Sequence, residues 1–449
     1  WLDEGLFTEI ARNIAFHGVW GIQISPGNYY LMNVTQVSVS YPVIFPIAGS
    51  LKIFGTGLWQ ARLPMIIYMY LLVVMFYLFA RKRYGFNSAI LSVLMLLSFS
   101  PFYGDGRTVL GEVPGLFFIV LGSWLFLYLE DGGFINKKWA ILSGVAFGLA
   151  VATKGIYLLG VSMALFISLI FWFKQIPDKK ILFTFLLGFI PPVLVWAYIH
   201  LISSNSLANF IPNYIHFASN HGSSINLSQT ILINFTRFFT ESTPILFLFL
   251  LVTIAITFFV RFFKIKSERF SIAECTIASF IVLNWVGYLA GTGWYRYFFP
   301  AHTLLYLLFP GAIYLLVRSI NNILIKRLLL VIPIALTLFQ FYHLVFLSDT
   351  SFVVHRTRNS ALSTALSKID SSKKVLFYGI IEGDIFLKGN NYGQYFSCDS
   401  CFLNGGDKNS IYDTSYDYIL TDVVPADFPS SKYDLEKVDR YILLKKKSK

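Results

Sequence analysis

Residues 1–12, Trp1-Leu2-Asp3-Glu4-Gly5-Leu6-Phe7-Thr8-Glu9-Ile10-Ala11-Arg12, place two adjacent carboxylates at the start of an amphipathic segment. The apolar residues Leu6, Phe7 and Ile10 recur at helical spacing, which predicts a short helix with one apolar face. Asp3 then has two interpretations. It can cap the helix by accepting backbone N–H groups, with Glu4 favoured by the positive helix end, or it can be a functional carboxylate.

The composition is that of an integral membrane protein. The chain has 449 residues, of which 56 % are hydrophobic and 13 % are charged, and its mean hydropathy is +0.63. Soluble domains carry about 25 % charged residues. The net charge of +12 does not indicate binding of nucleic acid, because the basic residues stand in short clusters between apolar runs. Clusters of this kind orient membrane helices. The chain starts at Trp1 rather than Met, so we expect a further N-terminal segment.

Ten apolar runs are long enough, or nearly long enough, to cross a bilayer. They cover residues 62–80, 87–103, 112–130, 139–153, 155–173, 181–202, 244–263, 272–291, 298–317 and 326–347. If residues 1–61 lie on the outer face, the basic clusters between runs all fall on the cytoplasmic side, as the positive-inside rule requires. These clusters are Arg81-Lys82-Arg83, Lys137-Lys138, Lys174 with Lys179-Lys180, Arg261 to Arg269, and Arg318 with Lys326-Arg327. We therefore predict a multi-pass protein of the plasma (inner) membrane.

This topology also gathers charged side chains at the outer interface. They are Asp3, Glu4, Asp105, Arg107, Glu112, Lys154, Glu241 and Arg296. Charges at membrane depth are costly and tend to mark function. A mixture of carboxylates and cations at one level of the bilayer therefore indicates a site.

The segments outside the apolar runs differ in character. Residues 1–61 are half-apolar and interrupted by proline and glycine, which predicts amphipathic interfacial helices in the first outer loop. The outer loop 203–243 is polar and is expected to be mobile or partly ordered. Residues 351–449 are charged and contain short β-type runs, which predicts a small soluble α/β domain on the outer face. These runs are 375–378, 418–420 and 441–444.

Five motifs occur in a fixed order along residues 1–350. They are Asp3-Glu4, Leu51-Lys52-Ile53-Phe54-Gly55 with Ala61-Arg62-Leu63-Pro64, Gly111-Glu112-Val113-Pro114, Thr153-Lys154-Gly155, and Tyr295-Arg296-Tyr297-Phe298-Phe299-Pro300. Together they resemble the GT-C superfamily glycosyltransferases of the protein O-mannosyltransferase and aminoarabinose (lipid A) transferase families. Two departures bear on the subfamily. Ser40-Tyr41-Pro42-Val43 has one proline and no lysine, and Glu112 stands where many relatives have aspartate.

The resemblance implies an α-helical polytopic membrane protein of GT-C type. Residues 1–350 would be its transmembrane catalytic domain, with one more span before Trp1. The implied reaction is an inverting transfer of a sugar from a polyprenyl-phosphate carrier, a membrane lipid, to a hydroxyl on an outer-face acceptor. That acceptor would be a protein, a glycolipid or a cell-surface glycan.

The resemblance also implies roles for the acidic residues. Asp3 is the expected general base, which removes the proton of the acceptor hydroxyl. Glu4 would support Asp3 or orient the substrate, although adjacent helical side chains diverge by about 100°. Glu112 either is a favourable charge at a helix N-terminus or positions the acceptor.

The basic residues have competing interpretations. Arg296, between Tyr295 and Tyr297, is either a snorkelling interfacial arginine or a bidentate ligand of the carrier phosphate. Lys154 is expected to contact the phosphate or the sugar. Asp105 and Arg107 form either a surface ion pair or part of the substrate site. Arg62 is interpreted as an interfacial anchor.

No cofactor is predicted. The chain has no glycine-rich phosphate loop, and His17 and His302 lack metal-ligand spacing, so they are expected to be structural or solvated. Cys398 and Cys401 form a lone CxxC pair, which is a weak zinc signal and fits a local disulfide or free thiols better. A divalent ion held by Asp3, Glu4 and Glu112 is compatible with the pattern but is not predicted.

Two other classes of function compete with the transferase. A transporter or flippase for lipid-linked sugars would carry ionisable residues at mid-membrane in both halves of the chain, and no internal repeat is evident. A non-catalytic lipid-binding membrane protein would retain its role after Asp3→Asn.

Overall fold

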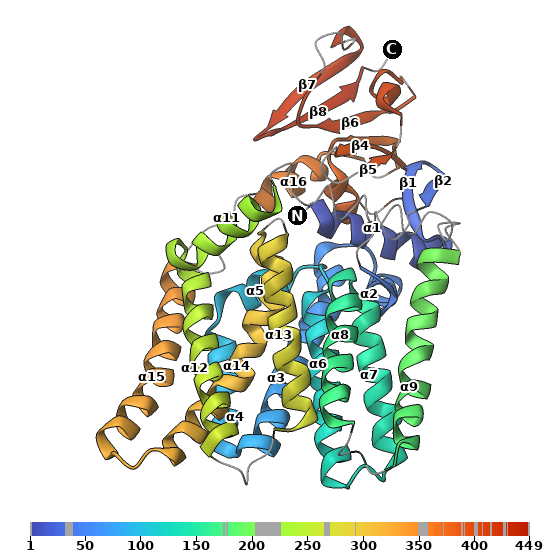
Figure 1. The fold of residues 1–449 in the computed structure, drawn as a ribbon. Helices are drawn as coiled ribbons and strands as arrows, with labels where there is room; N and C mark the ends of the chain where they lie inside the picture. Colours follow the sequence, from blue (N-terminus) through green and yellow to red (C-terminus); the bar gives the residue numbers. More distant parts are fainter. Residues whose placement is uncertain are drawn as a thin grey trace.

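The computed structural model describes the chain as a bundle of helices that carries a small sheet domain on one end (Figure 1). The described residues are 2–31, 39–173, 176, 178–202, 226–264, 270–291, 293–348, 358–370, 372–387, 389, 391–398, 403–405, 407–413, 415–424, 428 and 430–447.

The helices of the first half run from the N-terminal segment into the bundle. They are α1 (Leu2–His17), α2 (Tyr41–Phe54), α3 (Leu58–Tyr84), α4 (Phe86–Ser98), α5 (Ser100–Gly106), α6 (Glu112–Asp131), α7 (Lys137–Thr153), α8 (Gly155–Trp172) and α9 (Lys180–Ala197). The second half adds α11 (Leu227–Thr240), α12 (Ser242–Lys264), α13 (Ile272–Ala290), α14 (Tyr295–Ser319) and α15 (Ile323–Tyr342), followed by α16 (Arg358–Ser367).

The ten predicted apolar runs correspond to these bundle helices. Within the described residues, six helices are long and apolar enough to cross a membrane: α3, α6, α9 with its extension to Leu201, α13, α14, and α15 with its extension to Leu347. Helices α4 and α5 meet at a bend of 64° and would make a seventh span if counted together. Shorter apolar stretches lie in α2, α8 and α12. The predicted fold class, a polytopic helical membrane protein, is confirmed. The count of ten spans stays a prediction.

Lys154 separates two helices that the sequence left almost continuous. Its backbone is extended, with φ −156° and ψ 148°, between the last residue of α7 and the first of α8. The extended residue forms an isolated antiparallel β-bridge with Val39, and Ser40 N–H donates to the Thr153 carbonyl at 3.0 Å. Val39 and Ser40, directly before α2, therefore bind the extended backbone between α7 and α8.

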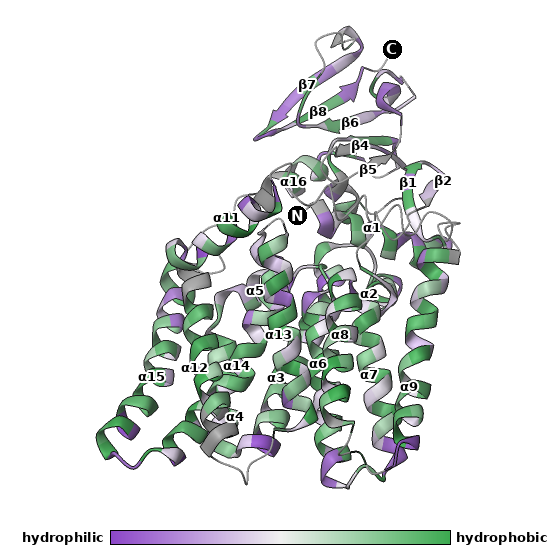
Figure 2. Ribbon diagram, viewed as in Figure 1, coloured by the Kyte–Doolittle hydropathy of each residue, from purple (hydrophilic) through white to green (hydrophobic). Residues whose placement is uncertain are grey.

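The charged loops lie at the end of the bundle opposite to α1 and the sheet domain. Lys82 pairs with Asp131, and Arg83 pairs with Glu274 at 2.7 Å, so the ends of α3, α6 and α13 meet there. Figure 2 shows hydrophobic residues along the bundle and hydrophilic residues at its two ends. Arg81-Lys82-Arg83, one of the basic clusters that we predicted on the cytoplasmic side, thus lies at this end of the fold.

Close helix packing inside the bundle depends on glycine. A Cβ added at Gly188 in α9 would lie 2.2 Å from the Ile141 carbonyl oxygen of α7, and one at Gly144 would lie 2.2 Å from the Phe185 carbonyl oxygen. Small residues of this kind let membrane helices approach closely. Helix α14 lies at the centre of the bundle, and 89 % of its 18-residue apolar stretch is buried. Helix α15 lies at the edge, and only 11 % of the corresponding stretch is buried.

The first outer loop departs from the prediction of helices alone. Residues Gly21–Ser25 and Asn28–Leu31 form the antiparallel strands β1 and β2, with Gly27 in their turn at φ +77°. The Pro26-Gly27 pair between two short runs is a hairpin signal, because glycine supplies positive φ at a turn. Helices α1 and α2 on either side of the hairpin do agree with the prediction.

The polar loop predicted at 203–243 is in part a helix. Residues 226–243 contain α11 and the first residues of α12, while residues 203–225 lie outside the described part of the chain. Asn226 caps α11 by accepting the Ser228 N–H at 3.4 Å.

The C-terminal domain contains a six-stranded mixed sheet, in agreement with the α/β class predicted for it. Its order is β5-β4-β3-β6-β8-β7, with β3 parallel to β4 and β6 and the remaining pairs antiparallel. The strands are β3 (Val375–Tyr378), β4 (Tyr392–Cys398), β5 (Leu403–Gly405), β6 (Tyr418–Thr421), β7 (Tyr433–Val438) and β8 (Tyr441–Lys446). The three predicted β-type runs are β3, β6 and β8. The predicted boundary at 350 and 351 and the residue Cys401 lie outside the described residues.

Candidate active site

Helix α1 lies across one end of the bundle, below the C-terminal sheet (Figure 1). Its apolar residues Leu6, Phe7 and Ile10 are buried in one cluster with Val43 and Ile47 of α2. The helix begins at Leu2, so Asp3 lies inside the first turn rather than at the position before it. Burial of the apolar face orients the helix, and the first turn then points its carboxylates at the neighbouring helices.

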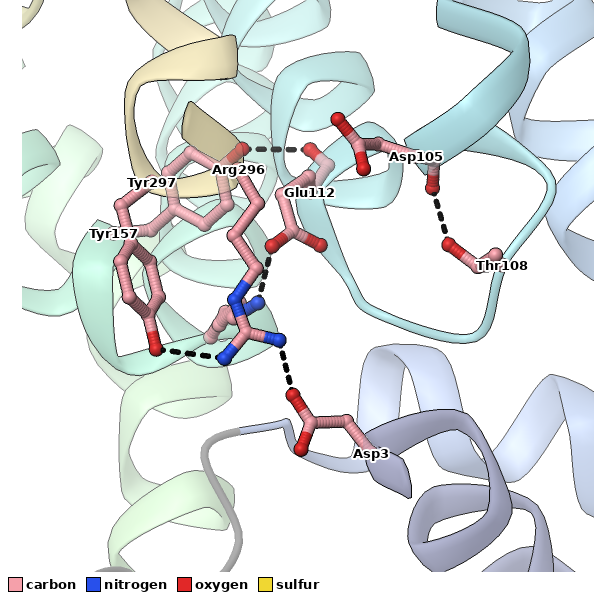
Figure 3. Close-up of polar contacts among 8 residues, drawn as sticks. Asp3, Asp105, Thr108, Glu112, Tyr157, Arg296 and Tyr297 are labelled. Atoms are coloured by element: carbon pink, nitrogen blue, oxygen red, sulfur yellow. Dashed lines mark hydrogen bonds and ion pairs between the residues drawn. The ribbon is translucent and has the colours of Figure 1, made fainter. Parts of the chain in front are cut away.

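Asp3 is paired with Arg296, the second residue of α14. The guanidinium Nη1 donates to Asp3 Oδ2, and the two side chains are 28 % and 15 % exposed. Figure 3 shows the two groups facing each other across the gap between α1 and α14. The simple N-cap interpretation of Asp3 is therefore wrong, because its carboxylate is directed to a cation of another helix.

Aromatic rings fix the orientation of Arg296. Its guanidinium carbon lies 4.8 Å from the Trp294 ring centroid and 5.0 Å from that of Tyr297. Nη2 also donates to the Tyr297 hydroxyl at 3.2 Å. A snorkelling arginine would hold its charged head in water. Here the head is mostly buried and paired, and its buried Nε has no hydrogen-bond partner in the described part of the chain.

A second ion pair is buried beside the first. Lys154 Nζ donates to Glu112 Oε1, and the side chains are 3 % and 0 % exposed. Glu112 is the first residue of α6, after Gly111 at φ +84°. The helix-terminus interpretation of Glu112 thus holds, but its carboxylate also neutralises a buried lysine. Its second oxygen has no hydrogen-bond partner among the described residues.

Tyr297 connects the two ion pairs. Lys154 Nζ lies 5.7 Å from the Tyr297 ring centroid, on the same ring that Arg296 contacts. Two cations and two carboxylates from α1, α6, α14 and the α7–α8 break are therefore gathered around one aromatic side chain (Figure 3). Four of the residues that the sequence singled out are brought together here: Asp3, Glu112, Lys154 and Arg296.

Asp105 adds a third carboxylate near this group. It lies in α5, after the 64° bend, and Figure 3 shows it beside Glu112. Thr108 Oγ1 donates to the Asp105 backbone carbonyl at 2.8 Å, whereas the Asp105 carboxylate accepts no hydrogen bond or ion pair from any described residue. The predicted surface ion pair between Asp105 and Arg107 is therefore not formed.

Glu4 faces away from Asp3. Its two oxygens accept Arg62 Nε at 2.7 Å and Nη2 at 2.6 Å, and its side chain is 4 % exposed. This bidentate pair joins α1 to α3. The expected support of Asp3 by Glu4 is thus replaced by a structural contact, because neighbouring helical side chains point in directions about 100° apart. Arg62 is a partner of Glu4 rather than only an interfacial anchor.

Tyr295 also turns away from the ion pairs. Its hydroxyl is 3.0 Å from His302 Nδ1, and His302 Nε2 is 3.0 Å from the Tyr306 hydroxyl. Gln340 donates to that hydroxyl and accepts Ser98 Oγ at 3.0 Å. These buried groups form a structural network in the bundle, in agreement with the structural role expected for His302.

Tyr157 is a site residue that sequence reasoning missed. Its hydroxyl donates to the Glu112 backbone carbonyl at 2.6 Å, and the side chain is fully buried. It also packs against Gly115, where an added Cβ would lie 2.1 Å from the Tyr157 ring. A tyrosine three residues after Lys154 was the available signal, but an aromatic residue in an apolar run is too common to be singled out.

The arrangement can hold an anion and accept a proton at one end of the bundle. Arg296 and Lys154 present guanidinium and ammonium groups, and Asp3 is the most exposed member of the two ion pairs. Within the described ranges, no group of three or more His, Cys, Asp or Glu side chains could hold a metal ion.

Comparison with known proteins identifies the fold. Residues 42–196 match the family model described as dolichyl-phosphate-mannose-protein mannosyltransferase. No curated protein matches the chain in sequence. The structure is similar to that of ArnT from Cupriavidus metallidurans bound to undecaprenyl phosphate, with a TM-score of 0.65 and 14 % identity over 98 % of this chain and 93 % of that one.

Archaeal structures are similar as well. The oligosaccharyltransferase of Archaeoglobus fulgidus in the apo form gives a TM-score of 0.58 at 11 % identity, over 92 % of this chain and 65 % of that one. AglB from the same organism, in complex with an inhibitory peptide and a dolichol-phosphate, gives 0.54 at 10 % identity, over 92 % and 64 %. The chain has the GT-C fold, and the matches support its resemblance to the GT-C superfamily glycosyltransferases.

Proposed function

Because the chain has the fold of the GT-C glycosyltransferases, we propose that it is an inverting transferase that uses a polyprenyl-phosphate sugar. The acceptor is a hydroxyl of a protein, a glycolipid or a cell-surface glycan on the outer face of the plasma (inner) membrane. The observation that carries the proposal is the pairing of Asp3 with Arg296 directly beside the Lys154–Glu112 pair. A transfer from a phosphate carrier needs both a base and positive charge, and both are present here.

The donor fits the surroundings of the site. Apolar helices surround the ion pairs on the bundle side, where the polyprenyl tail would lie, while the phosphate would sit at Arg296 and Lys154. A guanidinium can present two N–H donors side by side to the paired oxygens of a phosphate. The similar structure of ArnT is bound to undecaprenyl phosphate and that of AglB is in complex with a dolichol-phosphate, which supports a carrier of this chemical class.

The reaction is a single displacement. The acceptor oxygen attacks the anomeric carbon of the sugar and forms the new C–O bond while the bond from that carbon to the phosphate oxygen breaks. Asp3 takes the acceptor proton, and the polyprenyl phosphate leaves with the bonding electrons. One displacement at the anomeric carbon inverts its configuration. General-base help of this kind contributes about 10²–10⁴ in rate.

Arg296 has to serve two partners in turn. Without donor it neutralises Asp3. A carrier phosphate that binds to Arg296 competes for the guanidinium and leaves Asp3 available to accept a proton. Lys154 then shares its charge between Glu112 and the departing phosphate. Fixed cations at a developing negative charge typically contribute several kcal/mol, on the order of 10²–10³ in rate for a single donor.

The test is a transfer assay with purified protein in detergent. A panel of radiolabelled polyprenyl-phosphate sugars is incubated with hydroxyl-bearing acceptors and without nucleotide sugar. We expect labelled product with the inverted anomeric linkage from at least one donor. Translocation of the same lipids in proteoliposomes without product would contradict the transferase and favour a flippase.

A further inference from the structure

The C-terminal domain packs directly on the helix that carries Asp3. Figure 1 shows α1 between the bundle and the sheet domain. The short helix η3 (Ile381–Phe386) lies against α1, and β4 lies against β1. The domain therefore contacts the N-terminal segment, more than 350 residues away along the chain.

At Gly5 the backbones of α1 and η3 approach each other closely. A Cβ added there would lie 2.9 Å from the Glu382 Cα and 3.0 Å from the Glu382 backbone nitrogen. Both are backbone atoms, which cannot rotate out of the way. Glycine weakens the interior of a helix relative to alanine. Its presence in α1 is explained by the close approach of the η3 backbone, which leaves no room for a side chain. Any larger residue at this position requires α1 and η3 to separate.

Polar contacts tie the same surfaces together further along α1. Arg12 Nη2 donates to the Gly389 carbonyl at 2.5 Å. Gln23 Nε2 donates to the Tyr392 carbonyl at 2.6 Å, and the Tyr392 hydroxyl donates to Glu9 Oε1 at 3.3 Å. Glu9 is fully buried and also accepts the Gln23 N–H at 2.8 Å. Hydrogen bonds to buried charged groups are costly to break. These contacts therefore stabilise the packing of the C-terminal domain on the N-terminal segment.

The apolar cores are continuous across the interface. Phe396 of β4 is 2 % exposed and belongs to the same cluster as Leu6, Phe7 and Ile10 of α1. An appended module with its own closed core would leave such contacts to water. The N-terminal segment instead completes its core with a side chain of the C-terminal domain.

The geometry of α1 links this docking to Asp3. Residues on an α-helix are separated by about 100°, so Asp3 and Gly5 point in directions about 200° apart. Gly5 faces η3 while Asp3 faces Arg296, and Glu4 is held by Arg62 between them. Contact at Gly5 thus sets the rotation and height of α1, which in turn set the position of the Asp3 carboxylate.

We propose that the C-terminal domain is a positioning element of the active site, and that Gly5, Glu382 and Phe396 are positioning residues that hold Asp3 against Arg296. The proposal rests on the proposed transferase function. It assigns the domain a part in the transfer step itself.

The test compares Gly5→Ala with Gly49→Ala, a helical glycine of α2 whose added Cβ would meet nothing within 4 Å. We expect Gly5→Ala to lower kcat of sugar transfer about 10- to 100-fold, because small misplacements of a reacting group have effects of this size. KM for the donor should stay near that of Gly49→Ala. Amide hydrogen exchange should become faster in α1 and η3 and stay unchanged in α14.

Phe396→Leu is the second variant, because it loosens the same interface without a steric clash. We expect Phe396→Leu to lower kcat and to speed the exchange of α1 as well. It therefore tests the proposal even if Gly5→Ala does not fold. Wild-type kcat together with wild-type exchange of α1 in a folded interface variant would overturn the proposal. If the wild-type protein transfers no sugar from any donor, the proposed function fails, while unchanged α1 exchange in the variants separately refutes the positioning role.

Discussion

Asp3 and Arg296 lie 293 residues apart in the sequence and form an ion pair across α1 and α14. The pair joins the first turn of α1 to the start of α14, which is the most buried of the six membrane-length helices among the described residues. Lys154 and Glu112 form the neighbouring ion pair. The Tyr297 ring lies between the two pairs, because both Lys154 and Arg296 contact it. Two carboxylates and two cations are therefore held at one end of the bundle by helices from both halves of the chain.

Arg296→Ala should lower sugar transfer about 10²–10³-fold, because the departing phosphate loses a fixed cation. Arg296→Lys should keep the charge but lose the paired donors, and so retain only part of the activity. Initial rates with a polyprenyl-phosphate sugar provide the measurement. Arg318→Ala, at the far end of the same helix and beside Tyr314, is the control. Equal rates for the Arg296 and Arg318 variants would remove Arg296 from the site.

Single changes in the Lys154–Glu112 pair should destabilise the protein, since each leaves one buried charge unpaired. Lys154→Met or Glu112→Gln is expected to cost about 3–5 kcal/mol, and the double change Lys154→Met with Glu112→Leu should recover most of this loss. Thermal unfolding in detergent measures the effect. Transfer should remain low in the stable double variant, because the phosphate has lost Lys154. A double variant with full activity would show that the pair is structural only.

Glu4→Gln should affect stability more than catalysis. The bidentate contact with Arg62 is lost, at an expected cost of about 1–3 kcal/mol, while Asp3 keeps its own partner. The unfolding midpoint and the transfer rate are to be compared with those of Asp3→Asn. A Glu4→Gln variant that is as stable as wild type but as inactive as Asp3→Asn would restore Glu4 to a catalytic role.

Gly188→Ala should destabilise the bundle by about 1–3 kcal/mol through overpacking of α7 against α9. The added Cβ would meet the Ile141 carbonyl oxygen at 2.2 Å. Gly287→Ala in α13, where nothing lies within 4 Å, is the matched control. Thermal unfolding of both variants distinguishes a steric effect from a general effect of replacing glycine. Identical midpoints would argue against close α7–α9 contact.

Much of the architecture follows from local pattern. Apolar runs predict bundle helices because the hydropathy of each run is a local property, and short β-type runs at 375–378, 418–420 and 441–444 predicted three strands of the sheet. The shared sidedness of Asp3, Glu112, Lys154 and Arg296 in the predicted topology identified the four side chains that the fold gathers.

Pairing and docking could not be predicted in the same way. Glu4 pairs with Arg62, and the Tyr295 hydroxyl contacts His302. The sequence did not predict these contacts, because the directions of the side chains depend on how α1, α3 and α14 pack. The docking of the C-terminal domain on α1 depends on contacts such as Gly5 with Glu382. No periodicity within one segment encodes a contact between segments so distant.

The central claim is that Asp3 removes the acceptor proton, and Asp3→Asn tests it most directly. The amide keeps the size of the side chain and an oxygen for Arg296 but cannot act as a base at neutral pH. Asp131→Asn, in an ion pair with Lys82 at the other end of the bundle, is the control. We predict that Asp3→Asn binds the polyprenyl-phosphate sugar like wild type and transfers it at least about 10²-fold more slowly. Turnover equal to that of wild type and of Asp131→Asn would contradict the account.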